Sequence, residues 1–104
     1  MTETHVEFTV RLPSMLHQLA QGQSELTVEI APELENQAVS VARILDAVTA
    51  QYSVLGRRLR DETGAQRRHV NIYVDGEEIR RLNGLATEVT AVREIVIIQS
   101  VAGG

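Results

Sequence analysis

The sequence predicts a single α+β domain in which a β-sheet packs against one main helix. Three observations lead to this prediction. Several segments alternate between apolar and polar residues, which is typical of half-buried strands. One segment, which begins after Ser40, instead repeats its apolar residues at helical spacing. The length of 104 residues suits one domain that buries a modest core without disulfides or metals.

The first two strands are expected near the N-terminus. Segment 5–12 places Val6, Phe8, Val10 and Leu12 on one face and ends at Pro13. After a polar stretch through Ser24, segment 25–31 alternates in the same way. Two adjacent alternating segments favour an N-terminal hairpin.

The main helix is expected from about residue 41 to Tyr52. Residues 32–37 read as a connector, and Ser40 is a suitable N-cap. The apolar residues that follow recur at helical spacing: Val41, Ile44, Leu45, Val48 and Tyr52. Segment 54–68 predicts a short turn of helix and a solvent loop, with no function assigned.

The second half predicts three more strands. Segment 69–74 alternates, and Asp75-Gly76 is a strong turn signal. A short strand is expected at 78–80, an irregular loop at 83–87 and a last strand at 93–100. The pair Glu77-Glu78 beside the turn is interpreted as a solvated tip. The predicted order is therefore strand, strand, helix, strand, short strand, strand.

The last strand differs from the others because Ile95, Val96, Ile97 and Ile98 are apolar on both faces. A central strand covered on both sides would explain this, but one long helix cannot easily cover both faces of a sheet. We therefore favour an uncovered apolar face, which usually marks a surface for a partner.

Composition excludes several classes of function. The net charge of −4 gives no broad electrostatic attraction for nucleic acid, and the arginine pairs at 57–58, 67–68 and 80–81 are interpreted as solvated surface rather than a phosphate site. No apolar run is long enough to span a membrane, and the start of the chain does not read as a signal peptide. We expect a cytoplasmic protein without nucleic-acid or membrane partners.

Catalytic side chains are scarce. There is no cysteine, the three histidines lack metal-ligand spacing, and no nucleophile motif or phosphate loop is present. Neither an enzyme nor a bound cofactor or metal is expected. All ten basic residues are arginine, so no lysine side chain could be acylated by an activated carboxylate, although codon bias explains this equally well.

The sequence ends in Gly103-Gly104 directly after the last strand. Residues 1–100 are expected to form the domain and 101–104 a flexible tail. Because glycine has no Cβ, the terminal carboxylate could enter a narrow slot in another protein.

The predicted order of elements and the ending Val101-Ala102-Gly103-Gly104 resemble the ThiS/MoaD family of sulfur carriers. The stretches 70–80 and 84–87 are similar to carriers of its cysteine-synthesis branch. The chain departs from the family pattern at 91–93, where an Asp-Gly-Asp turn is common, and at Gln99, where proline is common.

The resemblance implies a ubiquitin-like β-grasp fold with a mixed sheet of four to five strands, the last lying between the first and third. It also implies that an E1-like adenylating enzyme uses ATP to activate Gly104, which becomes a thiocarboxylate, while Gly103 gives the tail access. The protein would be a cosubstrate of that enzyme.

The resemblance further implies that Tyr73, Val96 and Ile98, with Val101 and Ala102 of the tail, contact the adenylating enzyme. Tyr73 could equally be a solvent-facing strand aromatic. In the cysteine-synthesis branch, the later partners would be a PLP-dependent sulfhydrylase that uses O-phosphoserine and a metallopeptidase that releases cysteine.

Several alternatives remain open at this stage. The carrier could serve molybdopterin or thiamine synthesis, or it could be a ubiquitin-like modifier that is conjugated to lysines. It could also be a β-grasp binding module with an inert tail.

Overall fold

The computed structural model describes residues 5–31, 38–90 and 93–100. Within these residues the chain forms seven strands, two α-helices and three 3₁₀-helices. In chain order the elements are β1 (Val6–Arg11), η1 (Ser14–Ala20), β2 (Glu25–Ile30), β3 (Val39–Ser40), α1 (Val41–Gln51), α2 (Ser53–Leu59), β4 (Val70–Val74), β5 (Glu77–Glu78), η2 (Ile79–Arg81), η3 (Gly84–Ala86), β6 (Glu88–Val89) and β7 (Ile95–Gln99).

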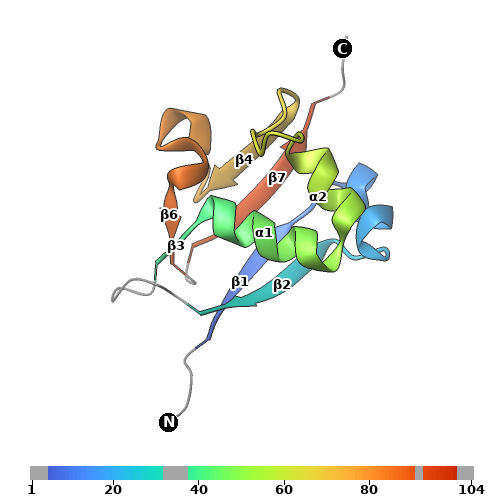
Figure 1. Cartoon of the computed structure of the whole chain (residues 1–104), viewed down its shortest axis with the longest axis horizontal. Helices are drawn as coiled ribbons and strands as arrows, with labels where there is room; N and C mark the ends of the chain where they lie inside the picture. Colours follow the sequence, from blue (N-terminus) through green and yellow to red (C-terminus); the bar gives the residue numbers. More distant parts are fainter. Residues whose placement is uncertain (1–4, 32–37, 91–92, 101–104) are drawn as a thin grey trace.

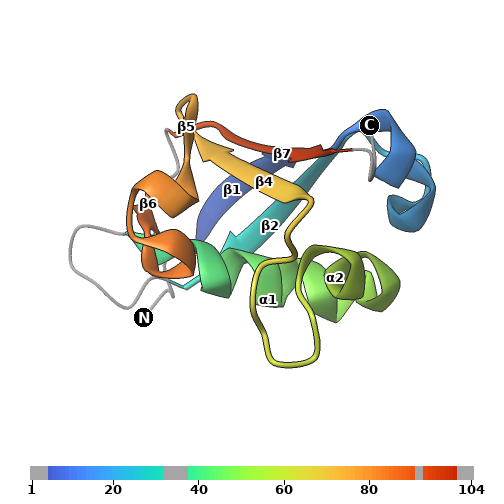
Figure 2. The same cartoon turned by 90° about the horizontal axis from the view of Figure 1, so that it is seen from above.

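The main sheet has five strands in the order β2-β1-β7-β4-β5. The central pair β1 and β7 is parallel, and the other pairs are antiparallel, so the sheet is mixed. The last strand, β7, therefore lies between β1 and β4, as the resemblance implied (Figure 1). Figure 2 shows α1 and α2 together on one side of this sheet, and neither of these two α-helices covers its other face.

The core fills the space between the sheet and the helices. The inward positions of β1 and β2 alternate strictly with exposed ones, which confirms the predicted hairpin partners. The largest fully buried side chains come from every layer of the fold: Phe8, Leu16, Ile44, Leu45, Leu55, Leu59, Ile72, Ile79, Ile95, Ile97, Val10 and Val28.

The main helix begins and ends where the sequence predicted. The Ser40 hydroxyl accepts a hydrogen bond from the backbone N–H of Arg43 at 3.2 Å, which caps the helix start. The turn at Asp75-Gly76 also matches the prediction, because both residues have positive φ angles of 52° and 85°.

Three local features differ from the sequence-based expectations. The polar stretch after Pro13 contains η1, which buries Leu16 and Ala20. The short strand expected at 78–80 is displaced to Glu77–Glu78 and is followed by η2. A second, two-stranded sheet pairs Val39 with Val89. The short strands and η2 have only two or three residues and therefore show no periodicity, whereas η1 has seven residues of which two, Leu16 and Ala20, are buried. Tertiary packing determines all of them.

Gly56 allows α2 to pack closely on α1. A Cβ at this position would lie 2.2 Å from Thr49 Oγ1 and 2.7 Å from Thr49 Cβ. Thr49 cannot rotate its own Cβ away, and its hydroxyl donates to the Leu45 carbonyl at 2.7 Å. The contact therefore requires a residue without a side chain at 56.

We expect Gly56→Ala to destabilise the domain because it forces α2 away from α1. Overpacking of this kind costs about 1–3 kcal/mol in the free energy of unfolding. Urea denaturation of the wild type, Gly56→Ala, Thr49→Gly and the double variant forms a double-mutant cycle. If Gly56→Ala cost the same in the Thr49→Gly background, the close contact would not be the cause.

Candidate partner-docking site

The strand β7 has one buried and one solvent-facing row of side chains. Ile95 and Ile97 are 1% and 0% exposed and face the helices. On the other face Val96 is half-buried, whereas Ile98 is 43% exposed. This confirms the predicted uncovered apolar face and contradicts the alternative of a strand covered on both sides.

Tyr73 lies beside this row. It is the direct antiparallel partner of Val96, and Asn71 is the partner of Ile98. Tyr73 is half-buried, and its neighbours Ile72 and Val74 face the core. We call Tyr73, Val96 and Ile98 the outer patch. The structure thus brings together the three predicted docking residues, while the remaining ones, Val101, Ala102, Gly103 and Gly104, lie outside the described residues.

Polar side chains border the outer patch on the side of β1 and β2. Arg11 pairs with Val96 in the sheet, and its Nε donates to Glu25 Oε2 at 3.0 Å. A hollow of about 240 Å³ extends along this border. It is lined by Thr9, Arg11, Glu25, Arg93, Glu94 and Ile95.

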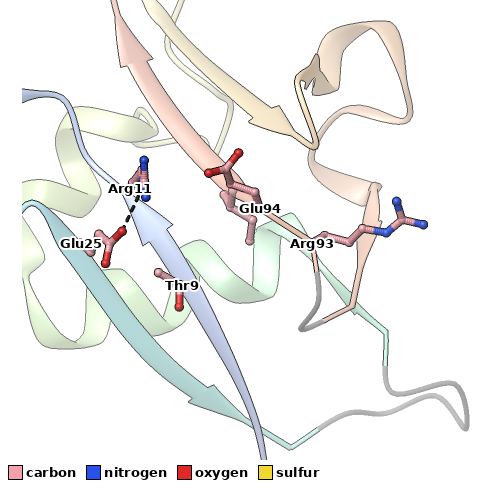
Figure 3. Close-up of a pocket in the computed structure, with 6 residues that line it drawn as sticks. Thr9, Arg11, Glu25, Arg93 and Glu94 are labelled. Carbon is pink, nitrogen blue, oxygen red and sulfur yellow. Dashed lines mark hydrogen bonds and ion pairs between the residues drawn. The ribbon is translucent and has the colours of Figure 1, made fainter.

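Figure 3 shows that Arg11 and Glu25 face one another in this hollow, while Arg93 extends away from them. Arg93 instead bonds Asp75 at 2.5 Å, and Asp75 also accepts the Glu94 backbone N–H at 2.9 Å. These hydrogen bonds, first that of Arg93, lower the pKa of Asp75. Because each arginine already has a carboxylate partner, the hollow reads as a polar border of the outer patch rather than an anion site.

The end of β7 is held by bonds to the start of β4. The Ser100 backbone N–H donates to the His69 carbonyl at 2.8 Å. Asn71 Nδ2 donates to Ser100 Oγ at 3.3 Å, and Asn71 Oδ1 accepts from Arg80 Nη1 at 3.0 Å. The residue that precedes the predicted tail is therefore anchored to the sheet.

Glu78 and Arg80 complete the open edge of β4, which β5 covers only at Tyr73 and Val74. Glu78 Oε2 accepts the Ile72 N–H at 3.2 Å, and Arg80 Nη2 donates to the Val70 carbonyl at 3.0 Å. The interpretation of Glu78 as a solvated tip is wrong, because its side chain is only 13% exposed. No sequence pattern predicts that Glu78 and Arg80 bind the edge of β4. Their two hydrogen bonds form because the turn at Asp75-Gly76 brings residues 78–80 back alongside β4.

The pKa of Glu78 is lowered in the folded protein. Burial raises it, but this effect is outweighed by hydrogen bonds from the Gln66 side chain and the N–H groups of Ile72 and Arg80, and by the Arg80 charge. The resulting stabilisation is fully present above the ordinary pKa of a solvent-exposed glutamate, and it is lost as the pH falls through the lowered folded-state pKa.

We expect Glu78→Gln to destabilise the domain at neutral pH, because both carboxylate oxygens of Glu78 accept backbone N–H groups, whereas the amide nitrogen of glutamine cannot accept. Hydrogen bonds to a charged group contribute about 1.5–3 kcal/mol in total here. The difference in the free energy of unfolding between the variant and wild type should shrink as the pH falls through the lowered folded-state pKa of Glu78, where the wild-type carboxylate becomes protonated as well. Urea denaturation at neutral and acidic pH measures this; a gap that stays constant would contradict the charge-based explanation.

Within the ranges that the structure describes, no group of three or more His, Cys, Asp or Glu side chains is placed to hold a metal ion. In the same part of the chain, no helix has the length and hydropathy to cross a bilayer.

Two comparisons with known protein sequences point to the same family. The profile of the ThiS family matches residues 18–104. The sulfur carrier protein CysO of Mycobacterium tuberculosis is 31% identical over 98 residues, which cover 92% of this chain and 97% of that protein.

Solved structures agree with this match. A chain in the crystal structure of the Amycolatopsis orientalis BexX/CysO complex has a TM-score of 0.78 and 28% identity, and the alignment covers 93% of this chain and 99% of that chain. The solution structure of the small archaeal modifier protein 1 of Methanosarcina acetivorans has a TM-score of 0.74 and 28% identity. This alignment covers 97% of this chain and 99% of that chain. The family match, the β-grasp sheet and these neighbours together show that the chain belongs to the ThiS family and is a ubiquitin-like sulfur carrier of the ThiS/CysO type.

Proposed function

We propose that this sulfur carrier is adenylated at Gly104 by an E1-like enzyme and is then converted to a C-terminal thiocarboxylate. One observation carries the proposal beyond the family match. Two of the three outer-patch residues, Val96 and Ile98, lie on β7, the strand that precedes the Gly-Gly ending in the sequence. An enzyme that docks on Val96 and Ile98 would therefore hold the chain just before the tail, which fixes where the carboxylate can reach.

The chemistry proposed for Gly104 has two steps. A carboxylate oxygen attacks the α-phosphate of ATP, and pyrophosphate leaves. A sulfur nucleophile then attacks the acyl carbon, and AMP leaves with the carboxyl oxygen that it had bonded. The carrier supplies the carboxylate and the docking surface, whereas the partner binds ATP and supplies the catalytic groups.

The pathway that we favour for the use of the sulfur is cysteine synthesis. Support comes from the 31% identity to CysO over nearly the whole of both chains. In this branch the thiocarboxylate sulfur attacks an electrophile derived from O-phosphoserine on a PLP-dependent sulfhydrylase. An S-to-N acyl shift then gives a carrier–cysteine amide, from which a metallopeptidase releases cysteine. Carriers for molybdopterin or thiamine synthesis would share the activation and differ only in the acceptor.

Intact mass spectrometry tests the activation. The carrier is incubated with ATP, a sulfur source and the adenylating enzyme of its host. A mass gain equal to one oxygen-to-sulfur exchange, localised to Gly104, is the expected result. No gain with an enzyme that is active on another carrier would favour a β-grasp binding module with an inert tail.

A second candidate is a ubiquitin-like protein modifier. The similarity to the archaeal modifier protein of Methanosarcina acetivorans over 97% of this chain favours it. Activation would be the same, but Gly104 would end in an isopeptide bond to a lysine of another protein. Tryptic digestion of host proteins would then yield branched peptides that carry the end of this chain, whereas a dedicated sulfur carrier yields none.

A further inference from the structure

Arginines that are far apart in the sequence meet at one place in the fold. Arg67 Nε donates to the Arg57 carbonyl at 2.6 Å. Arg80 Nη2 donates to the carbonyls of Arg67 at 2.8 Å and Arg68 at 3.4 Å. These bonds join the end of α2, the loop before β4 and η2. We call Arg57, Arg67, Arg68 and Arg80 the arginine rim.

The arginine rim lies beside the anchored end of β7. Val70, which follows the rim loop, is the sheet partner of Gln99, and the His69 carbonyl accepts the Ser100 N–H at 2.8 Å. Arg68 is thus the immediate neighbour of the residue that holds Ser100. A positive surface is placed where the chain leaves the sheet toward Gly104.

The rim arginines differ in whether their guanidinium groups already interact with carboxylates of the same chain. Arg80 bonds Glu78 at 3.3 Å, in addition to its bonds with carbonyl groups. Hydrogen bonds from Thr63 and Ala65 lower the pKa of Asp61, and the charge of Arg67 adds a smaller effect in the same direction. Arg57 and Arg68 are exposed, and neither guanidinium has a carboxylate within ion-pair distance among the described residues. These two charges are available to a partner.

We infer that the arginine rim docks against a carboxylate-rich protein surface that borders the slot for the tail; this inference rests on the proposed function. Guanidinium groups match carboxylates in planar, bidentate geometry. Nucleic acid is disfavoured because a chain of net charge −4 is repelled by a polyanion at long range. A small anion is disfavoured because the hollow next to Arg57 is also lined by Asp46, Asp61 and Glu62.

The rim would act with the outer patch and not in place of it. Apolar contacts of Val96 and Ile98 determine how long a complex lasts, whereas exposed charges mainly accelerate encounter. The two surfaces therefore predict different kinetic effects. Removal of a rim charge should lower the association rate constant, and the size of this decrease should depend on the salt concentration.

The test uses the full carrier and its host's E1-like adenylating enzyme, with association followed by stopped-flow fluorescence. The variants are Arg57→Glu and Arg68→Glu. The control is Arg43→Glu, which changes the net charge equally. Arg43 bonds the carbonyl of Ala31, which follows the strand end paired with Val6. Since β1 and β7 run parallel, this is the end of the sheet opposite to Ser100.

We expect Arg57→Glu and Arg68→Glu to associate about tenfold more slowly than Arg43→Glu near 0.01 M ionic strength, and the difference to vanish near 1 M, where the Debye length falls from about 30 to 3 Å. Arg68→Lys should stay within a few-fold of wild type because it keeps the charge. Circular dichroism confirms that each variant is folded.

Equal association rates for all three Glu variants, with an activated wild type, would overturn the inference and leave the proposed function intact. A difference that persists at high salt would also overturn it, because steering by charge would not be the cause. A wild type that neither binds the enzyme nor gains sulfur would overturn both, so the two failures are distinguishable.

Discussion

Deletion of Gly104 is expected to reduce thiocarboxylation to background. The variant still ends in a glycine carboxylate, but the chain is shorter by one residue, or about 3.3–3.6 Å of reach. Misplacement of a reacting group by about 1 Å can already cost about 100-fold in rate. If the enzyme holds the carrier by the outer patch, the shortened tail cannot bring its carboxylate to the α-phosphate of ATP.

The measurement is the intact mass of the carrier after incubation with ATP, a sulfur source and the adenylating enzyme. A variant with one extra glycine after Gly104 is the matched control, since it moves the carboxylate in the opposite direction and should also be inactive. Neither change touches the described domain, so thermal unfolding should match wild type. Full sulfur incorporation in the Gly104 deletion would contradict the proposed reach.

Val96→Asp is expected to weaken the carrier's interaction with the adenylating enzyme by about 2 kcal/mol or more, which raises the KM for the carrier about 30-fold. Val96 lies at the centre of the outer patch, between Arg11 and Tyr73 in the sheet. A carboxylate there would be desolvated when an apolar partner surface covers it. Because Val96 is half-exposed in the free carrier, the fold should tolerate the change.

Thr27→Asp is the control for Val96→Asp. Thr27 is an exposed residue of the edge strand β2 on the same side of the sheet, and it pairs with Thr9 rather than with the outer patch. The Thr27→Asp substitution adds the same charge as Val96→Asp, but on β2, two strands away from β7. Pyrophosphate exchange with increasing carrier concentration gives KM for each variant. Wild-type kinetics in a folded Val96→Asp carrier would show that the outer patch does not dock the enzyme.

These predictions depend on features that the sequence reveals to different extents. The strands β1, β2 and β4 and the helix α1 could be predicted because each is long enough to show its own apolar period, and β7 could be predicted from its continuous apolar run. The period of a strand requires one pair of the apolar run Ile95–Ile98 to face outward, and the family resemblance identified that pair as Val96 and Ile98. A periodic pattern reports burial directly, since it repeats with the geometry of the backbone.

The edge of β4 and the arginine rim could not be predicted in this way. Glu78 bonds Ile72, and Arg80 bonds the carbonyls of Arg67 and Val70, across turns that have no repeating pattern. The buried η1 and the pairing of Val39 with Val89 were missed for the same reason.

The class of fold, the main helix, the apolar last strand with one uncovered face and the glycine ending could thus be read from the amino-acid sequence, because each is encoded by neighbouring residues. The position of Tyr73 beside Val96 was implied by the family resemblance and is confirmed by the sheet pairing. The positions of Asn71 beside Ser100 and of the separate arginines beside the end of β7 came from the folded chain alone. Those placements depend on strand order and on the path of loops. Both are decided by the packing of the whole chain, which a local pattern does not contain.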